Sequence, residues 1–222
     1  MGIGIERSFE NNDIYTIVFV TILLCLTAIK LKYPKKFHAM LTSVYSKAFF
    51  LDYENELKTN FSGFKILLFL VQNLVFSVFF TKVYQMKISE DRFQDWELLR
   101  TVFLGLTVFI IAKHLISLVV ANIFNFVELF KGFHIQKFTY LKLCSLVMLP
   151  LLWFMVYSDI VYKPFLMSLS IGVFILLMAL TAVFVVFRNN KVIIENLFYF
   201  IVYLCTLEIV PILLIFKIAV DK

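Results

Sequence analysis

Six long apolar runs dominate the sequence and leave few folds open to it. Each run is bounded by charged residues or proline, and they cover residues 15–33, 64–84, 101–123, 139–157, 165–187 and 193–216. A helix that crosses the hydrocarbon core of a bilayer needs about 20 apolar residues. A water-soluble chain of 222 residues has no single core that could bury six such helices. The runs therefore predict an all-α, polytopic transmembrane helical bundle of about six spans, formed by residues 1–222 as a single integral membrane domain.

Composition excludes several classes of protein. Hydrophobic residues make up 62% of the chain and charged residues only 16%, which argues against a soluble enzyme, a nucleic-acid-binding domain and a disordered tail. The expected partner is the lipid bilayer, and no nucleic acid is expected. The three cysteines lie in apolar runs without metal-ligand spacing, so neither a disulfide partner nor a zinc site is expected for Cys25, Cys144 or Cys205.

The distribution of lysine and arginine predicts an orientation. Four lysines lie at the end of the first run, at positions 30, 32, 35 and 36, whereas only Arg7 precedes it. Cytoplasmic loops are enriched in basic residues, so the N-terminus is expected in the periplasm and the loop 34–63 in the cytoplasm of a bacterial inner membrane. Residues 1–13 carry a local charge of −2, which does not fit a cleaved signal peptide. With six spans, the inside segments hold 12 basic residues, including three in 131–142 that we assign to a loop.

Two segments have the pattern of helices outside the hydrocarbon core. Residues 37–51 place their apolar side chains on one helical face. This predicts an interfacial helix, which lies either in the headgroup plane or against the cytoplasmic side of the protein itself. Residues 124–138 alternate phenylalanine with polar residues, and we expect the third helix to continue through them beyond the membrane to about Gly132.

Ionisable residues within apolar runs are the candidate functional residues. A charged side chain at the bilayer centre costs about 2.5–3.5 kcal/mol on insertion scales, so such residues usually face other helices and pair. Lys113 and Glu208 lie within about 8 Å in depth if their helices are antiparallel, and we expect them to pair. Two interpretations remain open: an ion pair that only orients helices, or a proton or ion relay that also uses His114.

A polar face on the third helix extends this candidate site. Positions 114, 117, 121, 125 and 128 step by three or four residues, so they are expected on one face that points into the bundle. Ser168 and Gly172 of the fifth run form a step of small residues that allows close helix packing. Tyr203 lies on the same run as Glu208, near Pro211. The complete set of candidate residues is Lys113, His114, Asn125, Glu128, Tyr203 and Glu208.

Catalytic signatures are absent from the sequence. It contains no HExxH, GxSxG or Walker A pattern, and only three histidines. We therefore expect a protein that is not an enzyme and has no catalytic residues, metal ligands or cofactor.

The C-terminal run carries a resemblance. The stretch Tyr203-Leu204-Cys205-Thr206-Leu207-Glu208-Ile209-Val210-Pro211, together with Lys113 in the third run, resembles a family of small polytopic inner-membrane proteins from Bacteroidota that is catalogued as a domain of unknown function. The resemblance implies an inner-membrane location and no established activity. By family context we expect a subunit or assembly factor of a cell-envelope complex, such as secretion or gliding machinery, together with other inner-membrane or envelope proteins. The alternative is a small proton-coupled transporter or channel that uses Lys113, His114 and Glu208.

Overall fold

The computed structural model describes residues 12–43, 63–87, 95–123, 127–158 and 162–188. These ranges contain six helices and no strand. Five of the helices are long and apolar enough to cross a membrane, so the predicted fold class, a helical membrane bundle, is confirmed for the described part of the chain. The helices are α1 (Asp13–Lys32), α2 (Pro34–Thr42), α4 (Gly63–Lys87), α5 (Asp95–Ile123), α6 (Val127–Tyr157) and α7 (Lys163–Arg188).

The helix boundaries differ from the apolar runs mainly in α5 and α6. Helix α5 begins at Asp95, six residues before the predicted span, and α6 begins at Val127, twelve residues before its predicted span. Apolar runs mark only the part of a helix that needs a hydrophobic environment, whereas a helix can continue beyond it with polar residues. The sixth predicted span, 193–216, lies outside the described residues and stays a prediction.

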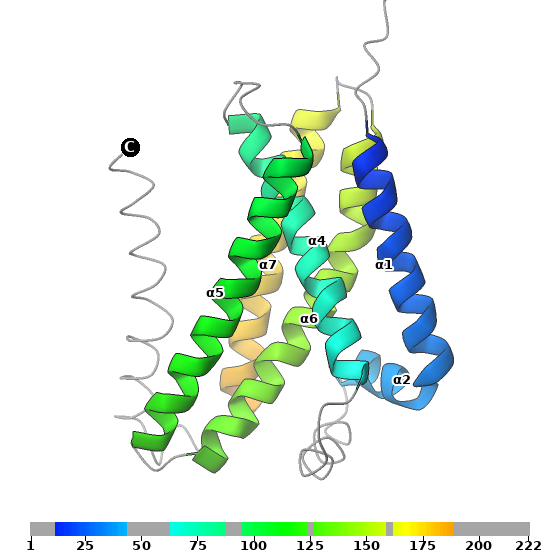
Figure 1. The fold of residues 1–222 in the computed structure, drawn as a ribbon. Helices are drawn as coiled ribbons and strands as arrows, with labels where there is room; N and C mark the ends of the chain where they lie inside the picture. Colours follow the sequence, from blue (N-terminus) through cyan, green and yellow to red (C-terminus); the bar gives the residue numbers. More distant parts are fainter. Residues whose placement is uncertain (1–11, 44–62, 88–94, 124–126, 159–161, 189–222) are drawn as a thin grey trace, which may run out of the picture.

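The five long helices alternate in direction along the chain (Figure 1). Helix α4 lies at the centre of the arrangement and packs against α1, α5 and α6, while α7 packs mainly on α6. Burial follows this arrangement: 56% of the most apolar window of α4 is buried, against 6% for α5 and 11% for α7. Helices α5 and α7 therefore turn most of their surface away from the rest of the described bundle.

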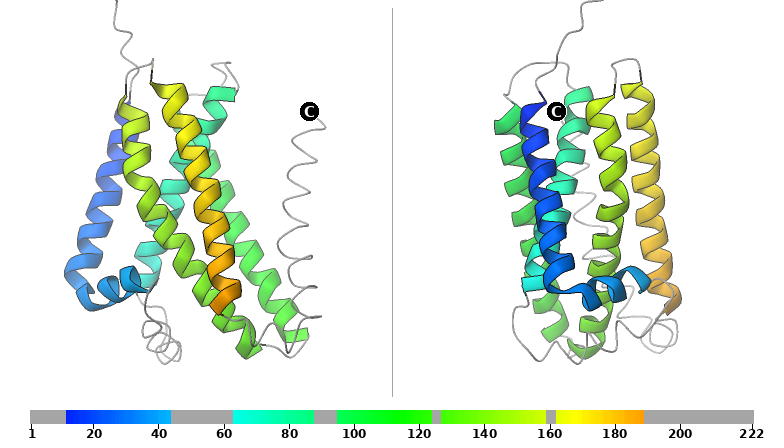
Figure 2. Two further views of the ribbon diagram at one scale, coloured as in Figure 1. Left: turned by 180° about the vertical axis from the view of Figure 1, so that it is seen from behind. Right: turned by 90° about the vertical axis from the view of Figure 1, so that its right-hand side faces the viewer.

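Helix α2 lies across one end of the bundle (Figure 2). It begins at Pro34, which is well suited to the first helical turn because it lacks a backbone N–H to satisfy. The side chain of Met40 is 1% exposed and belongs to the hydrophobic core. Of the two interpretations of the amphipathic segment, packing against the protein itself describes residues 34–42, while residues 44–51 lie outside the described ranges.

Hydrogen bonds between side chains tie four helices together at the opposite end, where α1 begins. The Tyr15 hydroxyl of α1 donates to Gln85 Oε1 of α4 at 3.2 Å, and Gln85 Nε2 donates to Asp95 Oδ1 of α5 at 2.8 Å. Tyr15 is completely buried, and the Lys82 ammonium group lies 3.9 Å from the centre of its ring. Thr16 of α1 shares a hydrogen bond of 2.6 Å with Tyr157 of α6. We refer to Tyr15, Gln85 and Asp95 as the tyrosine network.

Candidate functional site

The candidate residues fall partly inside and partly outside the described part of the chain. Lys113 and His114 lie on α5, and the backbone of Glu128 lies in α6. Asn125, Tyr203 and Glu208 are outside the described residues, so the pair of Lys113 and Glu208 stays a prediction.

The expected polar face of a single long helix is wrong. Helix α5 ends at Ile123 and the chain runs back in α6 from Val127, so Glu128 belongs to a different helix from His114. The sequence between the two helices contains neither glycine nor proline, which explains why the apolar pattern gave no sign of the reversal. His114 is also exposed rather than directed into the bundle, and its ring contacts Phe138 of α6 edge-on at 6.0 Å. Ser117, in contrast, is buried.

Lys113 lies among other lysines. Its ammonium group is close enough to that of Lys137 on α6 for the two charges to repel each other. In the same way, Lys142 of α6 is close to Lys65 of α4. Lys142 is only 9% exposed, which is unusual because lysine is rarely buried without a partner of opposite charge. We call these four residues, contributed by three helices, the lysine layer.

Helix register places Lys65 and Lys113 at nearly the same depth. The Asn73 side-chain amide donates a hydrogen bond to the Thr107 hydroxyl, which aligns the middle of α4 with the middle of α5. Lys113 follows Thr107 by six residues and Lys65 precedes Asn73 by eight, and both steps lead toward the end of the bundle where α2 lies. At about 1.5 Å per residue these steps are about 9 and 12 Å, so the two lysines differ by about 3 Å in depth.

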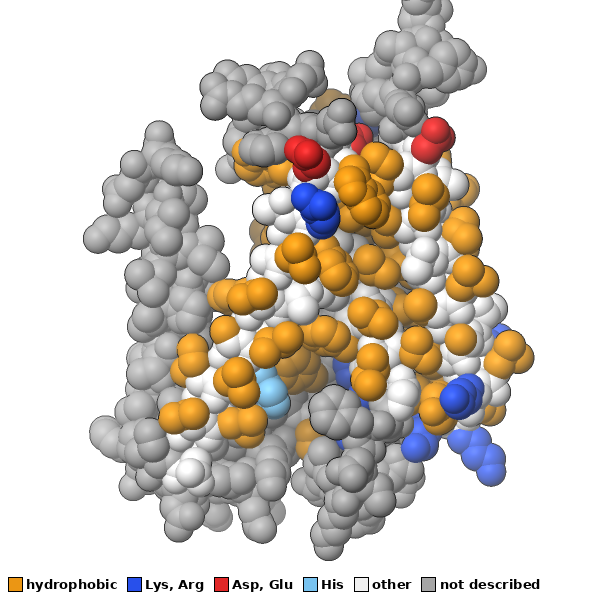
Figure 3. All heavy atoms as spheres, viewed as in Figure 1, with side chains coloured by type: hydrophobic (Ala, Val, Ile, Leu, Met, Phe, Trp, Pro, Cys, Tyr) orange, Lys and Arg blue, Asp and Glu red, His pale blue; other side chains and the backbone are white. Residues whose placement is uncertain are grey.

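The two lysines of α6 complete the layer from the third side. Lys142 follows Lys137 by five residues, which is about 7.5 Å along the helix toward the bundle centre. A lysine side chain is long and flexible enough to span this distance, and it commonly extends toward water from a buried stem. Figure 3 shows the surface hollowed between α5 and α4 at this depth, with Lys or Arg side chains at the bottom of the hollow.

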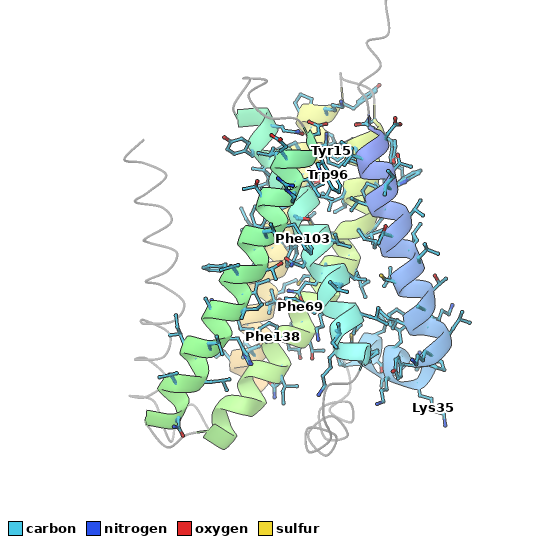
Figure 4. The ribbon with its side chains drawn as sticks, viewed as in Figure 1. Tyr15, Lys35, Phe69, Trp96, Phe103 and Phe138 are labelled. Atoms are coloured by element: carbon cyan, nitrogen blue, oxygen red, sulfur yellow. The ribbon has the colours of Figure 1, made fainter. Side chains whose placement is uncertain are left out.

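The end of the bundle that holds the tyrosine network carries charges of both signs, because Lys82, Arg100 and Lys163 lie there with the acidic side chains. The described acidic side chains are Asp13, Asp95 and Glu97, and all lie at the end that holds the tyrosine network. Several further lysines lie at the depth of the lysine layer or just beyond it, on α1 and α2, and one of them, Lys35, is labelled in Figure 4.

A column of buried polar groups runs along α4 from its middle to the tyrosine network. Asn73, Ser77, Thr81 and Gln85 repeat every four residues, so they follow one ridge of the helix, and the first three are completely buried. Within the described part of the molecule, Asn73 Oδ1 and Thr81 Oγ1 have no hydrogen-bond partner, nor does the neighbouring Gln72 Oε1. Phe103 of α5 and Phe69 of α4 lie between the tyrosine network and the lysine layer, and Phe138 of α6 lies at the depth of the lysine layer itself (Figure 4).

Sequence reasoning missed three of the four lysines in the layer. The sequence predicts both Lys137, which precedes the fourth apolar run, and Lys142, near the start of that run, to lie with the cytoplasmic loop 131–142. One signal could have placed them on a helix: between Gly132 and Pro150 the sequence has no residue that would end a helix, and Ile135 and Phe138 already follow a helical spacing. Lys65 lies at the start of the second run, where a basic residue is normally an interfacial anchor.

The described residues contain no group of three or more His, Cys, Asp or Glu side chains able to hold a metal ion. Cys144 lies in the core and its sulfur is 3.4 Å from the Thr181 hydroxyl, while Cys25 is half-buried. The polar groups of the described bundle are thus lysine ammonium groups, amides and hydroxyls, together with the Asp95 carboxylate of the tyrosine network.

Five apolar helices of spanning length, with polar groups gathered between them, define a multi-pass helical membrane protein. Comparison of the chain with protein families gives a match over residues 15–219 to the family described as Domain of unknown function (DUF4271). The chain belongs to this family, which confirms the resemblance to a family of unknown function. The comparisons with curated proteins and with solved structures give no match.

Proposed function

We propose that the protein is a non-enzymatic subunit or assembly factor of a cell-envelope complex in a bacterial inner membrane, with secretion and gliding machinery as the candidate settings. The observation that carries this proposal is the outward-facing surface of α7. Only 11% of its most apolar window is buried, and it packs mainly on α6. Within the described part of the chain, most of the surface of α7 is therefore uncovered, and we propose that a neighbouring protein packs on it.

Small residues on α7 support a helix as the neighbour. Ser168 and Gly172 are both exposed, and a Cβ atom added at Gly172 would meet nothing within 4 Å. Small residues four positions apart allow two transmembrane helices to approach closely, and the described bundle leaves this step unused. We therefore propose that a transmembrane helix of another envelope protein packs on this step.

Substitution of Gly172 tests the proposal. The Gly172→Leu variant should fold as the wild type does, because the added side chain enters open space, yet it should lose most of the protein that co-purifies with the wild type in mild detergent. Gly105→Leu is the matched control, because Gly105 on α5 is equally open. If the wild-type chain always elutes without a stoichiometric partner, the proposal fails. A large loss of stability in Gly172→Leu would mean that the chain itself packs there, and would also count against a partner at this step.

The same proposal includes the orientation of the protein in the inner membrane. Basic residues at the end of α1 and on α2 support a cytoplasmic position for that end of the bundle, and therefore a periplasmic N-terminus. Reporter fusions after residue 43 should be active only with a cytoplasmic reporter. Activity of a periplasmic reporter at this position would reverse the orientation.

The polar column of α4 favours a second candidate, a small proton-coupled transporter or channel. Buried hydroxyl and amide groups with unused acceptors can hold water, and a chain of such groups can conduct protons. The column runs from the tyrosine network toward the lysine layer, where Lys113 lies. In this reading Glu208 pairs with Lys113 and takes part in the relay with His114.

Proton flux into liposomes that contain the purified protein, followed with a pH-sensitive dye, tests this second candidate. Flux should exceed that of protein-free liposomes and fall at least fivefold in Thr81→Val, whereas Thr101→Val on the exposed face of α5 should leave it unchanged. Equal flux in all of these preparations would rule out proton transport. A Glu208→Gln variant that folds normally but loses flux would identify a carboxylate in the path.

A further inference from the structure

The end of α7 lies at the depth of the lysine layer. The ring of Tyr140 on α6 stacks on that of Phe184 on α7, with 5.9 Å between the ring centres. The two helices run in opposite directions, so Lys137, three residues before Tyr140, lies level with Phe187, three residues after Phe184. Helix α7 ends one residue later, at Arg188. The last described helix therefore ends beside the lysine layer.

The sixth apolar run, which lies outside the described residues, follows this end closely. Only residues 189–192 separate the run 193–216 from Arg188. Five steps of the backbone span at most about 17 Å when fully extended. A helix formed by the run therefore has to begin next to the end of α7 and return antiparallel to it.

The two central carboxylates of this run would lie at different depths and on different faces. Glu195 comes two residues after the start of the run, so a helix places it close in depth to Lys113 and Lys137. Glu208 follows 13 residues later, which is about 20 Å along a helix and about 140° around it. A single helix can therefore present only one of the two carboxylates to the lysine layer, and its depth favours Glu195.

One side of α7 brings such a helix next to the lysine layer. Lys137 lies one turn from Tyr140, which faces α7, and its ammonium group is repelled by that of Lys113 on α5. These two lysines therefore lie on the side of α6 between α5 and α7, which both pack on α6 but not closely on each other. On α5, Phe109 and Ile116 lie one turn to either side of Lys113, and they are 39% and 55% exposed.

We propose that residues 193–216 pack between α5 and α7 as a sixth transmembrane helix, with Glu195 rather than Glu208 as the carboxylate next to Lys113 and Lys137. A carboxylate placed between two ammonium groups is attracted to both and offsets their mutual repulsion. The pattern of the run fits this contact, because steps of three and four residues from Glu195 reach only apolar side chains. These are Phe198, Val202, Cys205, Ile209 and Ile212.

This contact and the helix of another protein use different faces of α7. The ring of Phe174 contacts Phe76 and Phe79 of α4, and Gly172 lies about 160° around the helix from Phe174. The step formed by Ser168 and Gly172 thus stays open when residues 193–216 pack on the side toward α5. A relay through Glu208, the second candidate function, would then not include Lys113.

Cross-linking in native membranes tests the position of the helix, with the whole chain and with its three cysteines replaced by alanine. Lys113→Cys is combined with Glu195→Cys or, as the matched control, with Glu208→Cys. A bifunctional thiosulfonate as long as a lysine–glutamate pair joins the thiols, and the intact mass distinguishes one bridging linker from two singly attached ones. We expect the first pair to be bridged in at least fivefold more molecules than the second. More bridging to position 208, or no bridging in either pair, overturns the proposal.

Exchange of charges tests the same contact without a linker. Glu195→Lys should lower the amount of monodisperse protein in mild detergent at least threefold, because it adds a positive charge next to Lys113 and Lys137. Lys113→Glu with Glu195→Lys should restore that amount to within twofold of the wild type, whereas Lys113→Glu with Glu208→Lys should not. Equal losses in the two exchanges contradict the assignment of Glu195, whichever function the protein has.

Discussion

Helices α4 and α5 take part in both ends of the bundle, but through different groups at each end. At the end where α1 begins, the tyrosine network joins α1, α4 and α5 through donors and acceptors that satisfy each other. At the other end, α4, α5 and α6 bring ammonium groups toward one another in the lysine layer. The comparison shows that complementary groups meet at one depth of the bundle and groups of like charge meet at another.

The largest loss of stability is expected from Tyr15→Ala, which disrupts the tyrosine network. Tyr15 is fully buried, so its removal leaves a cavity and also leaves Gln85 without a donor. The free energy of unfolding in mixed micelles should fall by about 3–5 kcal/mol, as for other large buried aromatic residues. Tyr15→Phe keeps the ring and should lose only about 1 kcal/mol. Equal losses in the two variants would show that the hydroxyl alone holds this end together.

In contrast, Lys142→Met at the other end should raise the free energy of unfolding. Methionine fills a similar volume without charge, so the repulsion from Lys65 and the burial penalty both disappear. Replacement of buried charges by apolar groups of similar size often stabilises a protein, here by about 1–2 kcal/mol in detergent free of anionic lipid. Lys35→Met on the exposed face of α2 should change the unfolding free energy by less than about 0.5 kcal/mol. A destabilised Lys142→Met variant would mean that the ammonium group has a stabilising partner within the chain.

Thr107→Val probes the midpoint between the two ends. The variant removes the hydroxyl that accepts a hydrogen bond from the Asn73 amide, while it keeps the shape of the side chain. Hydrogen bonds between transmembrane helices contribute about 0.6 kcal/mol on average and up to about 1.7 kcal/mol, and we expect a loss in this range. A double-mutant cycle with Asn73→Ala should show coupling between the two positions. Additive losses would show that the two helices are not in register at this point.

The smallest effect is expected from Thr16→Val at the rim of the stabilising end. The Thr16 hydroxyl shares a hydrogen bond with Tyr157 in an exposed position, where water can replace either partner. The unfolding free energy should fall by less than about 0.5 kcal/mol, in the same mixed-micelle measurement. A larger loss would show that the hydrogen bond to Tyr157 of α6 stabilises this end as the tyrosine network does.

Sequence predicted the class of fold well and the site poorly, for physical reasons. Apolar runs of spanning length are a direct consequence of the bilayer, so α1, α4, α5, α6 and α7 all coincide with predicted runs. The same logic places basic residues outside the membrane, which is why Lys142 was assigned to a loop although α6 carries it into the core. Which lysines face one another depends on helix packing, and no pattern within a single run encodes that. Lys113 was recognised because it interrupts a run, whereas its neighbour Lys137 interrupts none.

The length of α6 has a consequence for how the protein sits in its membrane. Its apolar part, Ile135–Tyr157, has 23 residues and is therefore about 34 Å long, while the hydrocarbon core of an average bilayer is about 30 Å thick. A helix accommodates such an excess by tilting away from the bilayer normal, by kinking or by thickening the bilayer locally. In a thinner bilayer α6 would tilt further from the bilayer normal, and in a thicker bilayer it would tilt less. Because α6 supplies two of the four lysines, membrane thickness would shift Lys137 and Lys142 relative to Lys65 and Lys113.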